Sequence, residues 1–229
     1  TSILWIATDA SGNKANTTQI VIVKDTTAPK ITAPGNITIK ATSLADNVVP
    51  LVNATTSDNV EVVSLTNNAS KTFPLGKTTV LWVATDEAGN KANATQIVDV
   101  ENTTPPKLTV PSGITFEATS LNNNTIPIGN ATATDIEPVT ITNNAPKTFP
   151  LGKTSILWTA KDTSGNISNG TQVIDVVDTT TPQIIAPSQV NVVAKSISDN
   201  SVSIGNATAS DNIKLISLTN NASKTFPLG

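Results

Sequence analysis

The chain has 229 residues, 14 lysines against 17 acidic residues and a formal net charge of −3. It contains no Cys, His, Met, Tyr or Arg, so the common thiol nucleophile, general base and zinc ligands are missing. Cysteine-protease, Ser-His-Asp and metal-thiolate chemistry are thereby excluded, and the lack of clustered cations argues against a nucleic-acid partner. No stretch approaches 18 consecutive apolar residues, so no membrane span is predicted. We expect no enzyme, no catalytic residue and no cofactor-binding residue.

The first predicted element is a β-hairpin at residues 1–23. Apolar residues occupy every second position around Trp5, which is typical of a strand that buries one face. Asp9 begins an Asp-Ala-Ser-Gly-Asn turn, in which the Asp side chain can accept nearby backbone N–H groups and Gly supplies a positive φ. The returning strand is predicted at residues 18–23.

Further elements follow the hairpin along the chain. Pro29 closes an Asp-Thr-Thr-Ala-Pro segment and is expected to make a short, semi-rigid linker. The alternation of residues 37–41 predicts another half-buried strand, and Phe73 in a Thr-Phe-Pro-Leu-Gly segment is expected to fill the end of a core. Short strands separated by turns at this spacing favour a β-sandwich.

The same elements recur twice more, at spacings of 76 or 77 residues. The recurring features are Thr-Phe-Pro-Leu-Gly from Thr72, Thr148 and Thr225, Leu-Trp ending at Trp5, Trp82 and Trp158, and Asp-x-x-Gly-Asn from Asp9, Asp86 and Asp162. The chain therefore holds three repeat equivalents. The predicted fold is all-β, with tandem immunoglobulin-like antiparallel β-sandwich repeats of about 76 residues in an elongated rod.

These motifs together resemble the hyalin repeat, or HYR domain, over the whole chain. The resemblance implies an immunoglobulin-like extracellular module that occurs in tandem, serves adhesion or scaffolding and is not an enzyme. The second copy departs from the pattern, with Thr-Asp-Ile-Glu-Pro at 134–138 in place of Ser-Asp-Asn and with Asn102 in place of the linker Asp.

The phase of the repeats predicts four segments. Residues 24–100 and 101–176 are complete HYR-like repeats, residues 1–23 are the C-terminal hairpin of an interrupted repeat, and residues 177–229 are the N-terminal part of one. Neither end piece should be stable alone, because each carries half a core and an unpaired sheet edge. Either the chain continues a longer repeat array, or the hairpin of one copy completes the last repeat of its neighbour by strand donation.

Asn-x-Ser/Thr sequons form the second signal. They lie at Asn16, Asn36, Asn53, Asn68, Asn93, Asn102, Asn123, Asn130, Asn166, Asn169, Asn206 and Asn221. Several recur at the same repeat position, so N-linked glycans on an extracellular surface are expected, although an Asn- and Thr-rich surface also creates sequons by chance. Sequons without disulfides suit an archaeal surface better than an animal matrix.

Recurrent carboxylates suggest a calcium site. The candidate ligands are Asp9, Asp25, Asp58, Asp86, Asp135, Asp162, Asp178 and Asp211. If they converge at one end of a sandwich, they could supply the oxygen ligands that Ca²⁺ requires. The alternative is that each Asp only caps a local turn.

The sequence therefore predicts a structural subunit or segment of an extracellular cell-surface filament, joined end to end through completion of the interrupted repeat. Its expected partners are further copies of itself, head to tail, and possible other surface polymers or cells. The alternative is the stalk of a cell-surface adhesin, stiffened by calcium, whose binding domain lies outside this segment.

Overall fold

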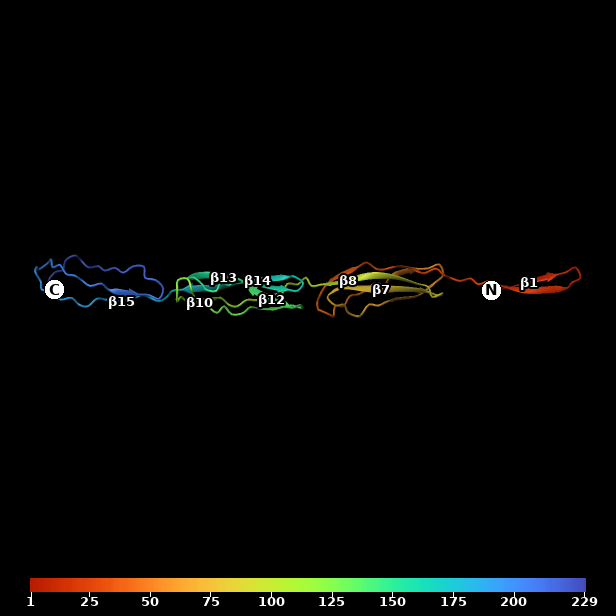
Figure 1. The fold of residues 1–229 in the computed structure, drawn as a ribbon, viewed down its shortest axis with the longest axis horizontal. Helices are drawn as coiled ribbons and strands as arrows, with labels where there is room; N and C mark the ends of the chain where they lie inside the picture. The colour runs from red at the N-terminus through yellow and green to blue at the C-terminus, as the bar shows by residue number, and fades with distance from the viewer. The chain divides into compact units, whose positions relative to one another are not determined.

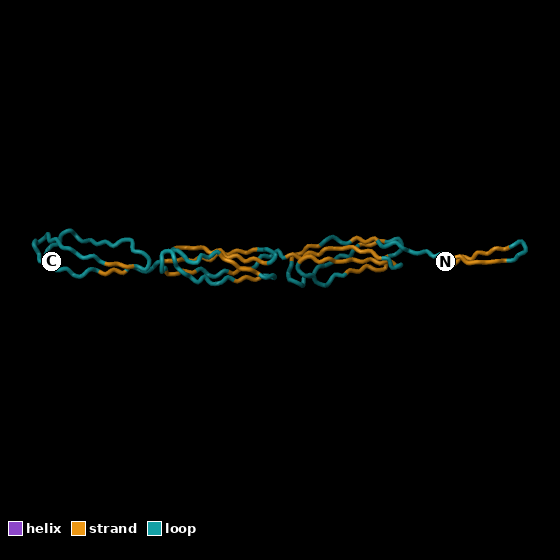
Figure 2. The backbone as a smooth tube through the Cα atoms, in the orientation of Figure 1, coloured by secondary structure: helices purple, strands orange, loops and turns teal.

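The computed structural model describes residues 1–229 as an all-β protein of sixteen strands. Figure 2 shows strands joined by turns and loops, with no helix. The chain falls into two compact units, Thr1–Thr103 and Thr104–Gly229. In neither unit is there a helix long and apolar enough to cross a membrane.

The first unit contains a hairpin and one complete sandwich. In the hairpin, β1 (Ser2–Thr8) pairs antiparallel with β2 (Lys14–Ile20). The sandwich has a four-stranded sheet in the order β4-β8-β7-β6 and a two-stranded sheet, β3-β5. These strands are β3 (Lys30–Thr32), β4 (Ile37–Lys40), β5 (Thr55–Ser57), β6 (Val62–Asn67), β7 (Gly76–Asp86) and β8 (Lys91–Glu101). The long β7 and β8 form the central pair of the four-stranded sheet (Figure 1).

The second unit repeats this sandwich and adds a less regular segment. Its sheets have the orders β10-β14-β13-β12 and β11-β9. The strands are β9 (Lys107–Thr109), β10 (Ile114–Glu117), β11 (Thr132–Thr134), β12 (Val139–Asn143), β13 (Gly152–Asp162) and β14 (Ile167–Val177). Beyond them, only β15 (Gln183–Ile185) and β16 (Thr208–Ser210) are strands, and they pair with each other.

One feature of the sheets differs from the antiparallel expectation. β4 pairs with β8 in parallel, as β10 does with β14. Parallel strands need a crossover between them, and here the intervening strands of the repeat supply it. The mixed sheet is thus a consequence of the sandwich topology, which strand periodicity alone does not reveal.

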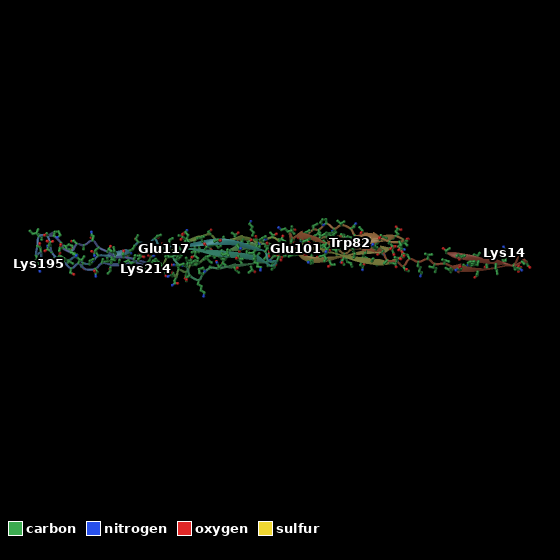
Figure 3. The ribbon with its side chains drawn as sticks, turned by 90° about the horizontal axis from the view of Figure 1, so that it is seen from above. Lys14, Trp82, Glu101, Glu117, Lys195 and Lys214 are labelled. Atoms are coloured by element: carbon green, nitrogen blue, oxygen red, sulfur yellow. The ribbon has the colours of Figure 1, made fainter.

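The predicted core positions are confirmed in both complete repeats. Val80, Trp82 and Ala84 on β7 are fully buried, and so is Phe73. Trp82 lies among the strands of its sandwich (Figure 3), and its indole Nε1–H donates to the side-chain oxygen of Gln96 on the neighbouring strand, at 3.3 Å. The Gln96 Nε2 in turn donates to the carbonyl of Gly35 at 2.7 Å. Burying an indole requires such a partner for its N–H.

The predicted turns are confirmed as well. Gly12, Gly89 and Gly165 adopt φ values of 86°, 92° and 95°, the left-handed region that favours glycine. The returning strands begin directly after these turns, at Lys14, Lys91 and Ile167. They therefore start earlier than the apolar alternation suggested, because pairing with the preceding strand continues down to the turn.

The two end segments lack the burial of the complete repeats. Trp5 is 59% exposed, against 1% for Trp82 and 4% for Trp158. Phe226 is partly exposed, although its counterparts Phe73 and Phe149 are buried. The apolar residues that form a core in residues 24–176 are thus present but open in residues 1–23 and 177–229.

Replacement of Trp82 by Ala should lower the free energy of unfolding by about 3–5 kcal/mol, because it leaves a large cavity and removes the donor to the buried Oε1 of Gln96. The matched change Trp5→Ala should cost less than about 1 kcal/mol in dilute solution, since an exposed side chain is removed. Denaturant unfolding followed by far-UV circular dichroism measures both. Equal losses for the two variants would contradict this assignment of the core.

Candidate metal centre

Three aspartates from separate parts of the first complete repeat converge on one point. Asp25 precedes β3, Asp58 follows β5, and Asp86 is the last residue of β7. One carboxylate oxygen of each lies within 4.8 Å of the others. The structure thus brings together carboxylate oxygens of three of the eight predicted ligands.

Local turns orient two of these carboxylates. The backbone N–H of Thr27 donates to Oδ1 of Asp25 at 3.0 Å, and that of Val60 donates to Oδ2 of Asp58 at 2.9 Å. These bonds leave Asp25 Oδ2 and Asp58 Oδ1 buried with no hydrogen-bond partner. A buried anionic oxygen without a partner is costly, so both oxygens are open to a cation.

Asn90 fixes the third carboxylate. Its backbone N–H donates to Asp86 Oδ1 and its Nδ2 to Oδ2, each at 2.8 Å, and Nδ2 also donates to the carbonyl of Thr27 at 3.2 Å. Burial acts to raise the pKa of Asp86, but these bonds from Asn90 and from the backbone of the turn outweigh it and hold the pKa below its usual value. Asp86 is therefore ionised at neutral pH, as a metal ligand must be.

The second complete repeat holds a related but altered cluster. Oxygens of Asp135, Glu137 and Asp162 lie within 4.8 Å of one another. Both Glu137 oxygens are engaged, one by the hydroxyl of Thr163 at 2.6 Å and the other by the N–H of Ser164 at 3.2 Å. Glu137 was not predicted from the sequence, although the Thr-Asp-Ile-Glu-Pro departure was noted there. It adds the third carboxylate in the copy where Asn102 replaces the linker Asp.

The donor set suits a hard cation. Carboxylate oxygens are the ligands that Ca²⁺ prefers, and neither cluster contains a nitrogen or sulfur ligand for a softer metal. The two orphaned oxygens of the first cluster make it the better fit.

The model of the HYR domain matches residues 24–100 and 101–176. The chain belongs to the HYR-domain family.

Two sea-urchin proteins are similar to it. Hyalin of Strongylocentrotus purpuratus is 33% identical over the full chain, and hyalin of Lytechinus variegatus is 32% identical over 82% of it. The chain spans only 21% and 39% of the length of these relatives. HYR repeats of this family are typically non-catalytic extracellular domains.

Among solved structures, a protocadherin gammaB4 extracellular domain aligns with 93% of the chain and 42% of its own length. The sequence identity is 18% and the TM-score is 0.35. Because the TM-score is this low, the similarity to this structure carries no argument about function.

The other predicted metal ligands lie outside the two HYR clusters. Asp9 accepts the N–H groups of Ser11 and Asn13, at 2.9 and 2.8 Å, as Asp86 does in its own turn. The side chain of Asn13 is the main cause that lowers the pKa of Asp9. Asp178 accepts the N–H of Thr180 at 3.2 Å, and Asp211 that of Ile213 at 3.0 Å. Asp9, Asp178 and Asp211 therefore accept local turn bonds like those of the clustered aspartates, but they belong to neither cluster.

The twelve sequon asparagines differ in exposure. Ten of the twelve asparagines are exposed, namely Asn16, Asn36, Asn53, Asn68, Asn93, Asn123, Asn130, Asn169, Asn206 and Asn221. Asn102 is only 6% exposed, and the Nδ2 of Asn166 donates to Asp162 at 2.8 Å. In the folded chain, the amide nitrogens of these two are the least suited to carry a glycan.

One buried polar residue with a structural role was not predicted from the sequence. Asn47 is fully buried, accepts the N–H groups of Thr42 and Ser43 at 2.8 and 3.1 Å, and donates to the carbonyl of Phe73 at 2.9 Å. Asn124 and Asn200 make the corresponding bonds in the other copies. Recurrence at one repeat position was the signal that could have found them.

Proposed function

We propose that this chain is a structural segment of an extracellular cell-surface filament built from tandem HYR repeats. Residues 24–100 and 101–176 act as complete modules, and residues 1–23 and 177–229 belong to an interrupted repeat whose completion joins segments end to end. The role is mechanical and non-enzymatic. The observation that supports this proposal is that each complete module buries its own core around one tryptophan. The number of modules would then determine the length of the segment.

The linker after the second complete repeat supports load transfer. Glu117 on β10 accepts the N–H of Thr179 at 2.9 Å, its hydroxyl at 2.8 Å and the hydroxyl of Thr180 at 3.0 Å. The backbone bond from Thr179 is the first cause that lowers the pKa of Glu117. Nearby, Asn212 Nδ2 donates to the carbonyl of Ala118 at 3.0 Å. Several bonds thus restrict the chain where it leaves the module.

Imaging of the native material tests this function. We expect filaments at the cell surface with an axial periodicity set by one HYR module. Dispersed, compact monomers in native extracts would contradict a structural role.

We further propose that Asp25, Asp58 and Asp86 bind calcium and thereby rigidify the first complete repeat. A cation would neutralise three carboxylates that otherwise repel one another, and it would satisfy the two orphaned oxygens. Waters would complete the six to eight oxygen ligands that Ca²⁺ takes. The second cluster, whose Glu137 is already bonded by protein donors, would bind less tightly.

Calcium at about 10 mM should raise the thermal midpoint of the wild-type chain by roughly 5–10 °C over its value in EDTA, if affinity resembles that of other extracellular modules. Asp58→Asn should abolish most of this shift, because it removes one charge with little change of shape. Asp99→Asn is the matched control. Asp99 belongs to neither cluster and pairs with Lys77, with 3.5 Å between Nζ and Oδ2, so this variant should keep the shift. An unchanged midpoint in EDTA and calcium would refute the site.

N-linked glycans on the exposed sequons are part of the same proposal, as they suit an extracellular surface. Peptide mapping of native material by mass spectrometry should find glycans at recurring exposed positions such as Asn53, Asn130 and Asn206, and none at the buried Asn102. Bare peptides at all recurring positions would contradict it.

A further inference from the structure

The outer face of the four-stranded sheet in the first complete repeat carries apolar side chains that its own core does not explain. Alternate residues of β7 are buried, and Leu81 and Val83 lie between them, half-buried, on the opposite face. On the neighbouring β8, Ile97 lies between two fully buried residues and is 37% exposed. Leu81 pairs with Thr95, so it lies diagonally across from Ile97 on the same face. We call Leu81, Val83 and Ile97 the outer patch.

The same positions are apolar in the other copies. Leu4 and Leu157 stand where Leu81 does, and Val173 stands where Ile97 does. In the second complete repeat, Leu157 and Val173 are 44% and 38% exposed. Polar residues are expected on the solvent face of a sandwich strand. A leucine that recurs there indicates that something other than the core of the module covers it.

A sequon begins directly beside the outer patch. Asn93 is exposed and pairs with Val83 across the β7–β8 ladder, a relation in which Cβ atoms are about 5 Å apart. Thr95, the hydroxyl residue of the same sequon, pairs with Leu81. Because side chains two positions apart in a strand share a face, Asn93 and Thr95 both lie on the outer face. A glycan on Asn93 would therefore start at the edge of the patch.

Two further sequons adjoin the patch from the edges of the sheet. The backbone N–H of Asn68 donates to the carbonyl of Leu81 at 3.2 Å, and Asn68 Oδ1 accepts the N–H of Leu81 at 2.7 Å. On the opposite edge, Asn36 Oδ1 accepts the N–H of Ile97 at 2.9 Å. Asn36 directly precedes β4 and Asn68 directly follows β6, the two edge strands of this sheet. Three sequons from separate parts of the chain thus meet at one apolar patch.

The amide nitrogens of these asparagines are available. The Nδ2 of Asn36, Asn68 and Asn93 donates to no protein group, and all three residues are exposed. In Asn36 and Asn68, the bond to Oδ1 fixes the amide and leaves Nδ2, the atom that carries an N-linked glycan, to the solvent. Asn166 is the contrast, since its Nδ2 donates to Asp162.

The second complete repeat separates the structural role of an edge asparagine from the sequon. Asn144 makes to Leu157 the two bonds that its counterpart makes in the first repeat, at 3.2 and 2.7 Å. Pro146 stands two positions later, so no sequon is formed, and Gly113 occupies the position at the other edge. Asn169 on β14 is the sequon that remains on this face. The bonds to the strand therefore account for the asparagine but not for the hydroxyl residue that completes a sequon.

We propose that N-linked glycans on Asn36, Asn68 and Asn93 cover the outer patch. The inference rests on the glycosylation proposed above and gives it a place and a role. Sugar rings carry C–H groups on their faces and hydroxyls at their rims, so a glycan can lie on aliphatic side chains and remain hydrated. Attachment at the rim of the patch holds the sugar there at a high effective concentration.

The cover would also decide which face of the module can meet other proteins. Three hydrated chains on one sheet face exclude a second sheet from it. The glycans therefore prevent the first complete repeat from associating side by side through its outer patch. The corresponding face of the second complete repeat carries one sequon, so it stays more open.

Hydroxyl-radical footprinting of the 229-residue chain, secreted by a eukaryotic host that attaches N-linked glycans, tests the cover. The tryptic peptide 78–91 contains Leu81 and Val83 and no sequon, so its oxidation is measured directly. The triple variant Thr38→Ala, Ser70→Ala and Thr95→Ala removes the three sequons and keeps each asparagine with its backbone bonds. Oxidation of Leu81 and Val83 should rise roughly threefold in this variant, because it follows the apolar area exposed to water.

Matched controls separate the glycans from the substitutions. The triple variant Thr38→Ser, Ser70→Thr and Thr95→Ser keeps all three sequons and should be oxidised as the wild type is. The wild-type sequence from a bacterial host without N-glycosylation should be oxidised as the triple alanine variant is, which tests the cover even if that variant folds poorly. The peptide 154–161, which contains Leu157 and also lacks a sequon, should be unchanged in both triple variants.

Glycopeptide mapping of native material distinguishes failure of the cover from failure of glycosylation. Glycans on Asn36, Asn68 and Asn93, together with equal oxidation of Leu81 in the wild type and the triple alanine variant, would overturn the cover and leave glycosylation standing. Bare asparagines at these three positions beside occupied ones elsewhere would overturn it too, and bare sequons throughout would refute the proposed glycosylation itself. Protection of Leu81 in the unglycosylated chain that rises with protein concentration would mean that a second copy covers the patch, and would also overturn the proposal.

Discussion

The whole repeat depends on one contact, the burial of a tryptophan hairpin against the other half of the sandwich. In the first complete repeat, β7 and β8 supply Val80, Trp82, Ala84, Val98 and Val100, all fully buried. The same two strands pair with β6 on one side and β4 on the other. Removing the hairpin therefore costs apolar burial and two ladders of backbone hydrogen bonds together. In residues 177–229, β15 and β16 are the only strands, and Asn200 and Phe226 form an isolated bridge.

The carboxylate cluster is coupled to this contact. Asp86 lies at the tip of the hairpin, whereas Asp25 and Asp58 come from the parts of the repeat that the hairpin covers. Asn90 bridges the two sides, because it bonds both Asp86 and the carbonyl of Thr27. Seating the hairpin thus assembles the cluster, and a cation bound there would in turn favour the seated hairpin by linkage.

The sequence was sufficient for features that repeat locally. Alternation placed Trp82 inside, and the Asp-x-x-Gly-Asn pattern placed Gly89 at a positive φ. It was insufficient where segments far apart in the chain meet. Neither the parallel β4–β8 pair nor the bonds of Glu137 to Thr163 and Ser164 correspond to any local sequence pattern. The burial of Asn102 has the same origin, because a sequon specifies three residues and says nothing of what packs on them.

Retention of each hairpin follows from tethering. The hairpins of the two complete repeats are similar in sequence, so chemistry alone would let one compete for the place of the other. In residues 24–100 and 101–176, however, the native hairpin is covalently attached to the half of the sandwich that it covers and acts at a high effective concentration. A hairpin from another repeat therefore cannot displace it at ordinary protein concentrations, and each HYR module keeps its own core although the repeats are alike.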